Sequence, residues 1–472
     1  MPSVKTSAKI FVCTNCDAQS PKWTGQCLEC GKWGTVEPAR ADWGGGSEAG
    51  ASPAATGFDA TRTAGRQAKT VMAKAATLDK ASTLDSERVK TGMNEIDRVL
   101  GGGLVAGSVI LLGGEPGIGK STLALIMCAS LARDGRRVLY VSGEESAAQV
   151  RMRAERLALP LDRLLFLDET DCDAIAAALE TDRPDLAVID SIQTVRSQLI
   201  PSEAGAQNQV RYAASRLVQA AKRANRPLLI VGHVTKDGQV AGPKTLEHLV
   251  DAVLSFEGER SHPLRLLRSL KNRFGPTDET GVFEMTEQGL KEIANPSAYL
   301  LDERRPGATG SAVTCVIEGT RPVLIEVQAL VQATSFGYPT RRATGFDQAR
   351  LEMLLAVLGN RGGLDLSQHD VYVNVVGGLK LKERSVDLAV AAAIVSAARR
   401  TPLPADSAVW GEIGLAGEVR SAPATERRLR EAAALGLKLA LTPLPRSGKL
   451  KPPAGIQVTE IKTVGDLVKR LS

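Results

Sequence analysis

Long apolar runs are missing from this sequence of 472 residues. No stretch of about eighteen or more uncharged apolar residues occurs, which excludes a conventional membrane-spanning helix. The N-terminal residues also lack the basic, apolar and small-residue zones of a signal peptide. We therefore expect a cytoplasmic protein that makes no contact with a membrane.

Cysteine is scarce, and its count is odd. The chain has 7 cysteines and no secretion signal, so a framework of disulfide bonds is not expected. Cys128, Cys172 and Cys315 stand apart from one another in apolar or mixed segments. We interpret these three as reduced, structural residues.

Charge of one sign does not dominate the sequence. The 59 basic and 53 acidic residues leave a net charge of +6, which permits contact with nucleic acid but is weak evidence for it. Hydrophobic residues make up 43% of the chain, which supplies enough apolar side chains for large cores and excludes global disorder. The length predicts two or three domains, and no internal repeat is found.

The other four cysteines lie close together near the start of the chain. Cys13 and Cys16 form one C-x-x-C pair, and Cys27 and Cys30 form a second. Two such pairs supply the four thiolates of a tetrahedral site, and we favour Zn²⁺ over an iron–sulfur cluster because a structural site suits a redox-silent ion. The alternative is a free or catalytic C-x-x-C pair.

Shifts in composition divide the chain into four parts. We predict a zinc finger at 1–35 and a flexible linker at 36–85, where Gly, Ala, Ser and Thr prevail. Between 86 and 300, short apolar blocks alternate with helix-length segments, which predicts a parallel sheet covered on both faces. A second α/β domain is predicted at 301–472.

A complete phosphate-binding motif follows an apolar run and opens a predicted helix. Its glycines let backbone N–H groups point at a phosphate, and the helix dipole favours the anion. Lys120 is predicted to reach the β- and γ-phosphates and Ser121 to bind Mg²⁺, so we expect ATP to bind here. The alternative is a glycine-rich turn without a ligand. The predicted nucleotide-binding residues are Gly114, Glu115, Pro116, Gly117, Ile118, Gly119, Lys120, Ser121 and Thr122.

Polar residues follow the neighbouring apolar runs, where ligands of open α/β sheets collect. Asp190 ends the run LAVID, and we predict that its carboxylate acts on Mg²⁺ from the outer coordination sphere. Glu144 is predicted to accept a proton from the attacking water, with Glu145 as the other candidate; alternatively these acids cap the next helix. Gln193 and His233 are possible sensors of the γ-phosphate, or ordinary polar loop residues.

The segment KNRFG comprises Lys271, Asn272, Arg273, Phe274 and Gly275. Residues two apart on a strand point to the same side, so Lys271 and Arg273 are expected to face the same way. They are predicted to reach the nucleotide of a neighbouring subunit, where a guanidinium stabilises the charge of the transition state. The alternative is a solvated strand end with two cations.

Taken together, these motifs resemble the bacterial RadA (Sms) family of recombination and repair proteins, relatives of RecA and of DnaB-type helicases. The resemblance covers nearly the whole chain, including TGMNEIDRVLGGGL, SGEES, LAVIDSIQT, GHVTKDG and KNRFG. It implies an α/β fold: a RecA-type ATPase core with an N-terminal zinc-ribbon-like finger and a C-terminal domain similar to the Lon peptidase.

The resemblance also implies an activity and partners. The expected activity is DNA-dependent ATP hydrolysis, with Mg²⁺, by a hexameric ring on single-stranded and branched DNA. It is coupled to branch migration of recombination intermediates in company with the RecA recombinase. Lys271 and Arg273 would then act across subunit interfaces.

Two rival functions belong to other classes. The Lon-like tail suggests an ATP-dependent protease, but Val386 stands where the peptidase serine is expected and Glu426 where its lysine is expected. Neither residue can supply a nucleophile or an amine base, although Ser385 is only one position away. The other rival is a RecA-like ATPase that acts on a protein partner.

Overall fold

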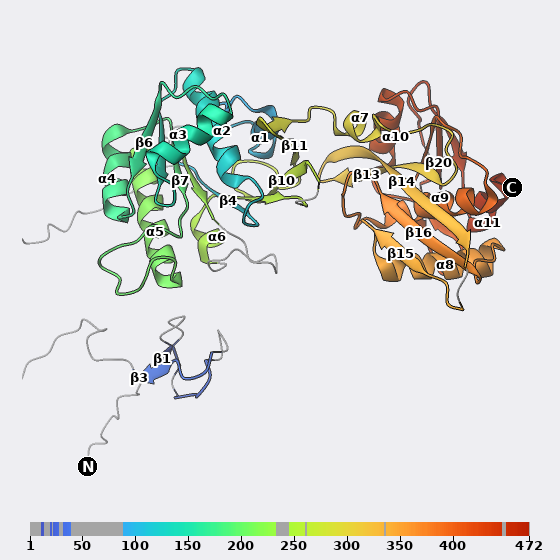
Figure 1. Ribbon diagram of the computed structural model, residues 1–472, viewed down its shortest axis with the longest axis horizontal. Coiled ribbons are helices and arrows are strands. Elements are labelled where there is room, and N and C mark those ends of the chain that lie inside the picture. Colours follow the sequence, from blue (N-terminus) through green and yellow to red (C-terminus); the bar gives the residue numbers. More distant parts are fainter. Residues whose placement is uncertain are drawn as a thin grey trace, which may run out of the picture. The chain divides into compact units, whose positions relative to one another are not determined.

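The computed structural model describes residues 11–13, 19–20, 22–27, 32–38, 88–232, 245–259, 262–334, 337–445 and 450–471. The chain divides into two compact units, Met1–Leu84 and Asp85–Ser472, each of which is described by itself (Figure 1). Among the described helices, none has the length and apolar character needed to cross a membrane.

The N-terminal unit contains a small antiparallel sheet. Its described strands are β1 (Phe11–Cys13), β2 (Gln19–Ser20) and β3 (Val36–Pro38), in the order β2-β1-β3. Cys13, Cys27 and Val36 form its cluster of buried apolar residues. Three residues are a very small core, which fits the expectation that a bound metal stabilises this unit.

A nine-stranded sheet forms the centre of the first part of the second unit, within the described residues. Its strand order is β12-β11-β10-β9-β4-β8-β7-β5-β6, and the six strands from β9 to β6 in that order run parallel. This confirms the parallel sheet that the sequence predicts. The strands are β4 (Val109–Gly114), β5 (Val138–Ser142), β6 (Leu164–Asp168), β7 (Leu186–Asp190), β8 (Leu228–Val231), β9 (Ala252–Glu257), β10 (Leu264–Asn272), β11 (Thr280–Thr286) and β12 (Gly289–Glu292).

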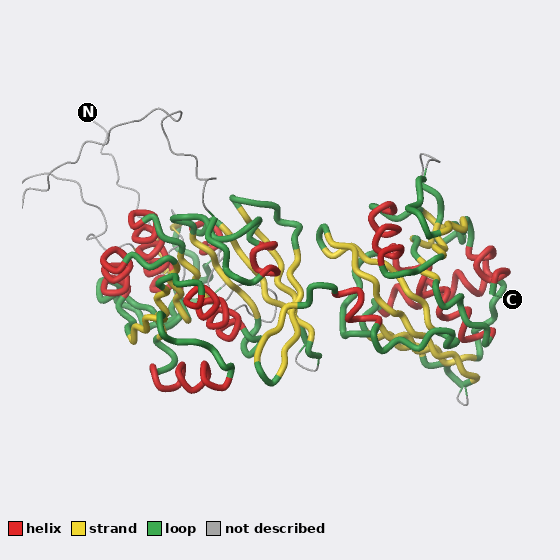
Figure 2. Tube along the Cα trace, turned by 90° about the horizontal axis from the view of Figure 1, so that it is seen from above, coloured by secondary structure: helices red, strands yellow, loops and turns green. Residues whose placement is uncertain are grey.

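Helices cover both faces of this sheet, as Figures 1 and 2 show. The central strands β4 and β7 are buried throughout, so their side chains supply two separate apolar clusters, one on each face. The first cluster also contains α1 (Asn94–Val99), α2 (Lys120–Arg133) and α3 (Ala147–Arg156). The second contains α4 (Cys172–Asp182), α5 (Gln207–Ala224) and α6 (Thr245–Leu249).

The C-terminal part is built on a mixed sheet in the order β13-β14-β16-β15. Its strands are β13 (Ser311–Glu318), β14 (Arg321–Ala333), β15 (Arg341–Thr344) and β16 (His369–Val375). The helices are α7 (Pro296–Leu301), α8 (Gln348–Gly362), α9 (Asp387–Arg399), α10 (Thr425–Ala434) and α11 (Val464–Arg470). Shorter elements are the 3₁₀ turn Arg384–Val386 and the strands β17 (Ser407–Val409), β18 (Glu412–Ile413), β19 (Val419–Arg420), β20 (Leu439–Thr442) and β21 (Gln457–Glu460).

Strand β10 contributes to the cores of both parts. Leu267 lies in the cluster with α2 and β4, whereas Leu264 lies in the cluster with α8, α9 and β14. Ion pairs add to this junction: Arg321 on β14 contacts the buried Glu95 of α1 at 2.8 Å, and Arg268 contacts Glu318 at 2.6 Å. Helix α7 (Pro296–Leu301) packs against β14. The residues that pack with the C-terminal part therefore begin at this helix, slightly before residue 301.

Candidate functional site

The predicted phosphate loop connects β4 to α2 at the carboxyl end of the sheet. Gly117 and Gly119 have φ values of +77° and +113°, a region that residues with a Cβ rarely adopt. A Cβ on Gly114 would lie 2.5 Å from the carbonyl oxygen of Phe256. Glycine is therefore required at all three positions, and the loop ends at the N-terminus of α2, which favours an anion.

Lys120 lies over this loop with only 4% of its surface exposed. Its Nζ donates hydrogen bonds to the carbonyl oxygens of Gly114 at 2.8 Å and Glu115 at 3.0 Å. Burial lowers the pKa of Lys120, while the nearby Asp190 and Glu144 carboxylates oppose that shift. The ammonium group thus has uncharged loop partners that a phosphate oxygen can replace.

Ser121 and Asp190 lie in direct contact, although 69 positions separate them in the sequence. Ser121 Oγ donates a hydrogen bond to Asp190 Oδ1 at 3.1 Å. Asp190 is 4% exposed and ends β7, which lies one strand away from β4 across β8. A hydroxyl and a carboxylate beside a phosphate loop are oxygen ligands of the kind that Mg²⁺ prefers.

Two residues that sequence reasoning missed complete this side of the site. The hydroxyl of Tyr140, on β5, donates a short hydrogen bond to Asp190 Oδ2. Arg153, on α3, donates to the Tyr140 hydroxyl at 3.2 Å. The sequence carries one signal for Tyr140, since it is the residue with a polar group in the interior of an otherwise aliphatic strand.

Glu144 lies in the connection between β5 and α3. Its Oε1 accepts a short hydrogen bond from Ser191 Oγ, so it lies beside the residue that follows Asp190. Helix α3 is capped by a reciprocal pair of hydrogen bonds between Ser146 and Gln149. Capping of this helix is therefore performed by residues other than Glu144.

Glu145 has a different environment from Glu144. Its Oε2 forms an ion pair with Arg153 Nη2 at 2.8 Å. Of the two adjacent acids, Glu144 is the one directed toward the end of β7, where the predicted magnesium carboxylate lies.

The predicted sensors lie in or near the connections after β7 and β8. Gln193 is half-buried in the turn after β7, and its Nε2 lies 3.9 Å from the position that a Cβ on Gly232 would occupy. His233 lies outside the described residues. Gln193 thus borders the end of β8 at the same sheet edge as the phosphate loop.

The KNRFG segment begins on β10 and continues past the strand's end at Asn272. Lys271 Nζ donates to the carbonyl oxygens of Glu247 at 2.5 Å and Val250 at 2.8 Å, and Arg273 Nη1 lies 3.4 Å from Asp251 Oδ1. Both cations therefore point toward the connection between α6 and β9.

These contacts keep both cations away from the phosphate loop of their own chain, as far as the structure describes it. Burial lowers the pKa of Lys271, and Arg273 adds to the shift. The Arg273 side chain is 55% exposed, which leaves its guanidinium accessible from outside the subunit. Its neighbour Phe274 is held by Arg88, which donates to the Phe274 carbonyl oxygen at 2.7 Å.

The predicted zinc ligands are described only in part. Cys13 and Cys27 are buried in the same small cluster, although 14 positions separate them. Cys13 Sγ donates a hydrogen bond to Thr35 Oγ1 at 3.2 Å. Cys16 and Cys30 lie outside the described residues. One cysteine of each C-x-x-C pair thus lies in the same small core, which fits a metal held by both pairs.

The C-terminal domain has no accessible serine at the position considered for a peptidase nucleophile. Val386 is fully buried and Ser385 is 3% exposed, both in a 3₁₀ turn. Glu426 lies on α10, where its carboxylate is 3.7 Å from Arg430. A carboxylate paired with a guanidinium cannot activate a hydroxyl as an amine base does, so the geometry provides no peptidase site here.

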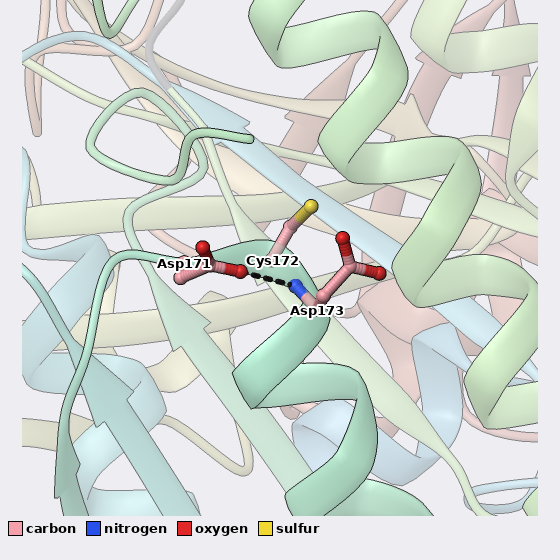
Figure 3. Close-up of side chains that lie close together, drawn as sticks. All are labelled: Asp171, Cys172 and Asp173. Atoms are coloured by element: carbon pink, nitrogen blue, oxygen red, sulfur yellow. Dashed lines mark hydrogen bonds between the residues drawn. The ribbon is translucent and has the colours of Figure 1, made fainter. Parts of the chain in front are cut away.

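Three neighbouring side chains at the start of α4 could also be taken for a metal site (Figure 3). Asp171 caps the helix, because its Oδ1 accepts hydrogen bonds from the backbone N–H groups of Asp173 at 2.8 Å and Ala174 at 3.3 Å. Asp173 forms an ion pair with Arg216 at 2.6 Å. Cys172 is buried, which raises the pKa of its thiol. These roles in folding account for all three residues.

Comparisons with known proteins agree with this geometry. A family model for an AAA domain matches residues 74–239, and a model for a rubredoxin metal binding domain matches residues 11–38. DNA repair protein RadA of Bacillus subtilis is 45% identical over 466 residues, covering 98% of this chain and 98% of the relative. The proteins of the same name in Pseudomonas aeruginosa and Escherichia coli are 47% identical, covering 96% of both chains, and 46% identical, covering 98% of both chains.

Proposed function

This chain belongs to the RadA family of DNA repair proteins, and from that premise we propose that it is a DNA-dependent ATPase acting on single-stranded and branched DNA. It uses ATP hydrolysis to promote branch migration of recombination intermediates. The observation that carries the ATPase part of this proposal is the contact between Ser121 and Asp190 beside the phosphate loop, with Glu144 bonded to the residue after Asp190. The DNA part rests on the family.

Each residue of the site has a separate task in this proposal. The loop from Gly114 to Thr122 binds the phosphates through its N–H groups, and Lys120 exchanges its carbonyl partners for phosphate oxygens. Ser121 would hold magnesium and Asp190 would act on it from the outer coordination sphere, and the bound ion would neutralise charge on the β- and γ-phosphates. Glu144 orients the attacking water and accepts its proton. Gln193 and His233 sense the γ-phosphate.

The KNRFG cations complete the site from a neighbouring subunit. Arg273 is exposed and contacts the nucleotide of the next subunit. Lys271 donates hydrogen bonds to carbonyl groups at the end of α6 and so holds the same segment in place. A guanidinium on the γ-phosphate stabilises charge that develops as the terminal bond breaks. This arrangement requires head-to-tail contacts between subunits, and we propose that they close into a hexameric ring that encircles single-stranded DNA.

The finger and the tail serve assembly and partner binding. Cys13, Cys16, Cys27 and Cys30 hold Zn²⁺, which supplies the stability that the small N-terminal core lacks. Strand β3 belongs to the finger, so the predicted linker at 36–85 begins after Pro38, and the residues that follow join the finger to the core while the protein cooperates with the RecA recombinase. The Lon-like domain is a scaffold for the ring, and the protein acts in the cytoplasm.

The test is ATP turnover by the zinc-loaded full chain with and without single-stranded DNA. We expect DNA to stimulate turnover and salt to weaken the effect, because phosphate contacts release counterions. Lys120→Ala should abolish turnover, whereas Lys291→Ala, which removes an exposed lysine on β12, should leave it unchanged.

Other outcomes would favour the rival functions. Turnover that DNA does not stimulate would favour a protein partner. Digestion of casein with ATP would restore the protease hypothesis. Unchanged turnover in Lys120→Ala would refute the assignment of the phosphate loop.

A further inference from the structure

The Asp190 carboxylate is held at both oxygens by donors from different elements. Ser121 on α2 donates to Oδ1 at 3.1 Å, and Tyr140 on β5 donates to Oδ2. Asp190 is 4% exposed and Tyr140 is fully buried, so water does not compete for these bonds. Two donors at opposite ends fix the plane of the carboxylate and direct its remaining lone pairs.

The direction of the tyrosine hydrogen bond is also fixed. Arg153 Nη2 donates to the Tyr140 hydroxyl at 3.2 Å, and a guanidinium can only donate. The single proton of the hydroxyl is therefore left for Asp190. Arg153 is in turn oriented by its ion pair with Glu145 at 2.8 Å, and the Tyr140 ring stacks on Phe166 with centroids 6.5 Å apart.

The protonation state of Tyr140 suits this role. Burial raises the pKa of Tyr140 well above its usual value, and the charge on Asp190 raises it further. The geometry agrees, since the hydroxyl accepts from Arg153 and uses its one proton in the hydrogen bond to Asp190. A neutral phenol can donate to one oxygen of the buried Asp190 carboxylate without adding a second negative charge beside the proposed magnesium site.

We propose that Tyr140 and Arg153 are positioning residues that orient Asp190 for magnesium. This inference rests on the proposed use of ATP at the site. The chain of contacts runs from Glu145 through Arg153 and Tyr140 to Asp190, and ends at Ser121. It therefore joins α3 to both predicted magnesium-binding groups. Outer partners that orient a metal's ligands typically change metal affinity about 10- to 100-fold when removed.

The first test is Tyr140→Phe, which removes one hydroxyl and keeps the ring. We expect the Mg²⁺ concentration that gives half-maximal binding of a fluorescent, non-hydrolysable ATP analogue to rise about tenfold. Binding of the analogue without Mg²⁺ should be unchanged, because the loop from Gly114 to Thr122 and Lys120 is intact. The Mg²⁺ midpoint of ATP turnover should shift by the same factor.

Tyr299→Phe is a matched control. The Tyr299 hydroxyl also donates to a carboxylate, Glu284 Oε1, at 2.8 Å, but Tyr299 lies on α7 and Glu284 on β11. This variant removes a hydrogen bond of the same kind from another part of the chain. We expect its Mg²⁺ midpoint to equal that of the wild type.

Arg153→Met tests the rest of the chain of contacts without altering Tyr140. It should shift the Mg²⁺ midpoint in the same direction by less than Tyr140→Phe, because the tyrosine can then rotate its hydroxyl. The double variant should shift it no further than Tyr140→Phe alone, since both residues act through one bond.

Three results would overturn the proposal. One is an unshifted Mg²⁺ midpoint in folded Tyr140→Phe, with folding checked by thermal unfolding. Another is an equal shift in Tyr299→Phe, and the third is full additivity of Tyr140→Phe and Arg153→Met. A wild-type chain that binds no nucleotide even with Mg²⁺ would instead refute the proposed ATPase.

Discussion

Mixed rings provide a strict test of the proposed role of Arg273. Arg273→Ala should fold normally, because an exposed ion pair of this kind contributes at most about 1 kcal/mol to stability. Its partner Asp251 also stays satisfied, since Oδ2 accepts from the Val109 N–H at 3.0 Å and Oδ1 lies 3.5 Å from Lys222 Nζ. Turnover should nevertheless fall about a thousandfold or more, because the transition state loses the guanidinium that stabilises its charge.

The magnitude of rescue follows from the geometry of a closed ring. A site is active when one subunit supplies Lys120 and the next supplies Arg273. If Lys120→Ala and Arg273→Ala subunits are mixed at random, a fraction f(1 − f) of the interfaces carries both intact groups, where f is the share of either variant. Turnover should thus rise to about one quarter of the wild-type value at equal mixing. Each variant alone should be inactive.

The assay is steady-state ATP turnover with single-stranded DNA, measured across mixing ratios after the variants are combined before ring assembly. Arg223→Ala is the matched control, because Arg223 is likewise 55% exposed and pairs with an acid, Glu180, at 2.7 Å. Mixing Arg223→Ala with Lys120→Ala should give turnover that falls steadily with the share of the second variant. Turnover near zero at every ratio of Arg273→Ala to Lys120→Ala would refute action across the interface.

Further predictions concern the loop, the metal and the pH dependence. Gly119→Ala should destabilise the core by about 1 kcal/mol or more in thermal unfolding, because φ is +113°, a backbone conformation that residues with a Cβ rarely adopt. Removal of zinc by a chelator should make the segment at 11–38 sensitive to protease while nucleotide binding by the core persists. Burial raises the pKa of Tyr299 from its usual value of 10.0 to about 12, so the folded state holds this proton more tightly. The resulting stability is present below about pH 10 and lost as pH rises through about 12, and Tyr299→Phe should remove that part of the alkaline dependence.

The contiguous parts of the site could be predicted from the sequence, whereas the contacts across strands could not. The phosphate loop is local, and its glycines report their own backbone requirements. Asp190 was predicted from its place at the end of an apolar run, and β7 indeed ends there. The order of strands was not predicted, so the apposition of Asp190 and Ser121 was only implied.

Tyr140 and Arg153 were missed because their roles depend on packing between elements. In the parallel register, Tyr140 pairs with Val188, and only its long side chain reaches Asp190 two positions further along β7. No local pattern encodes that reach. The cap of α3 can be predicted from the sequence, since Ser146 and Gln149 have the spacing of a capping box. That spacing indicates that residues other than Glu144 cap the helix.

Strand β10 has a consequence for how this protein can change in evolution or in the laboratory. Leu264, at its start, is packed among residues of the C-terminal domain, and its far end carries KNRFG. The two domains are therefore not interchangeable modules. A foreign tail grafted after β12 would have to reproduce the apolar surface around Leu264 and the acid that Glu318 supplies to Arg268, or the strand that presents Arg273 would lose part of its packing.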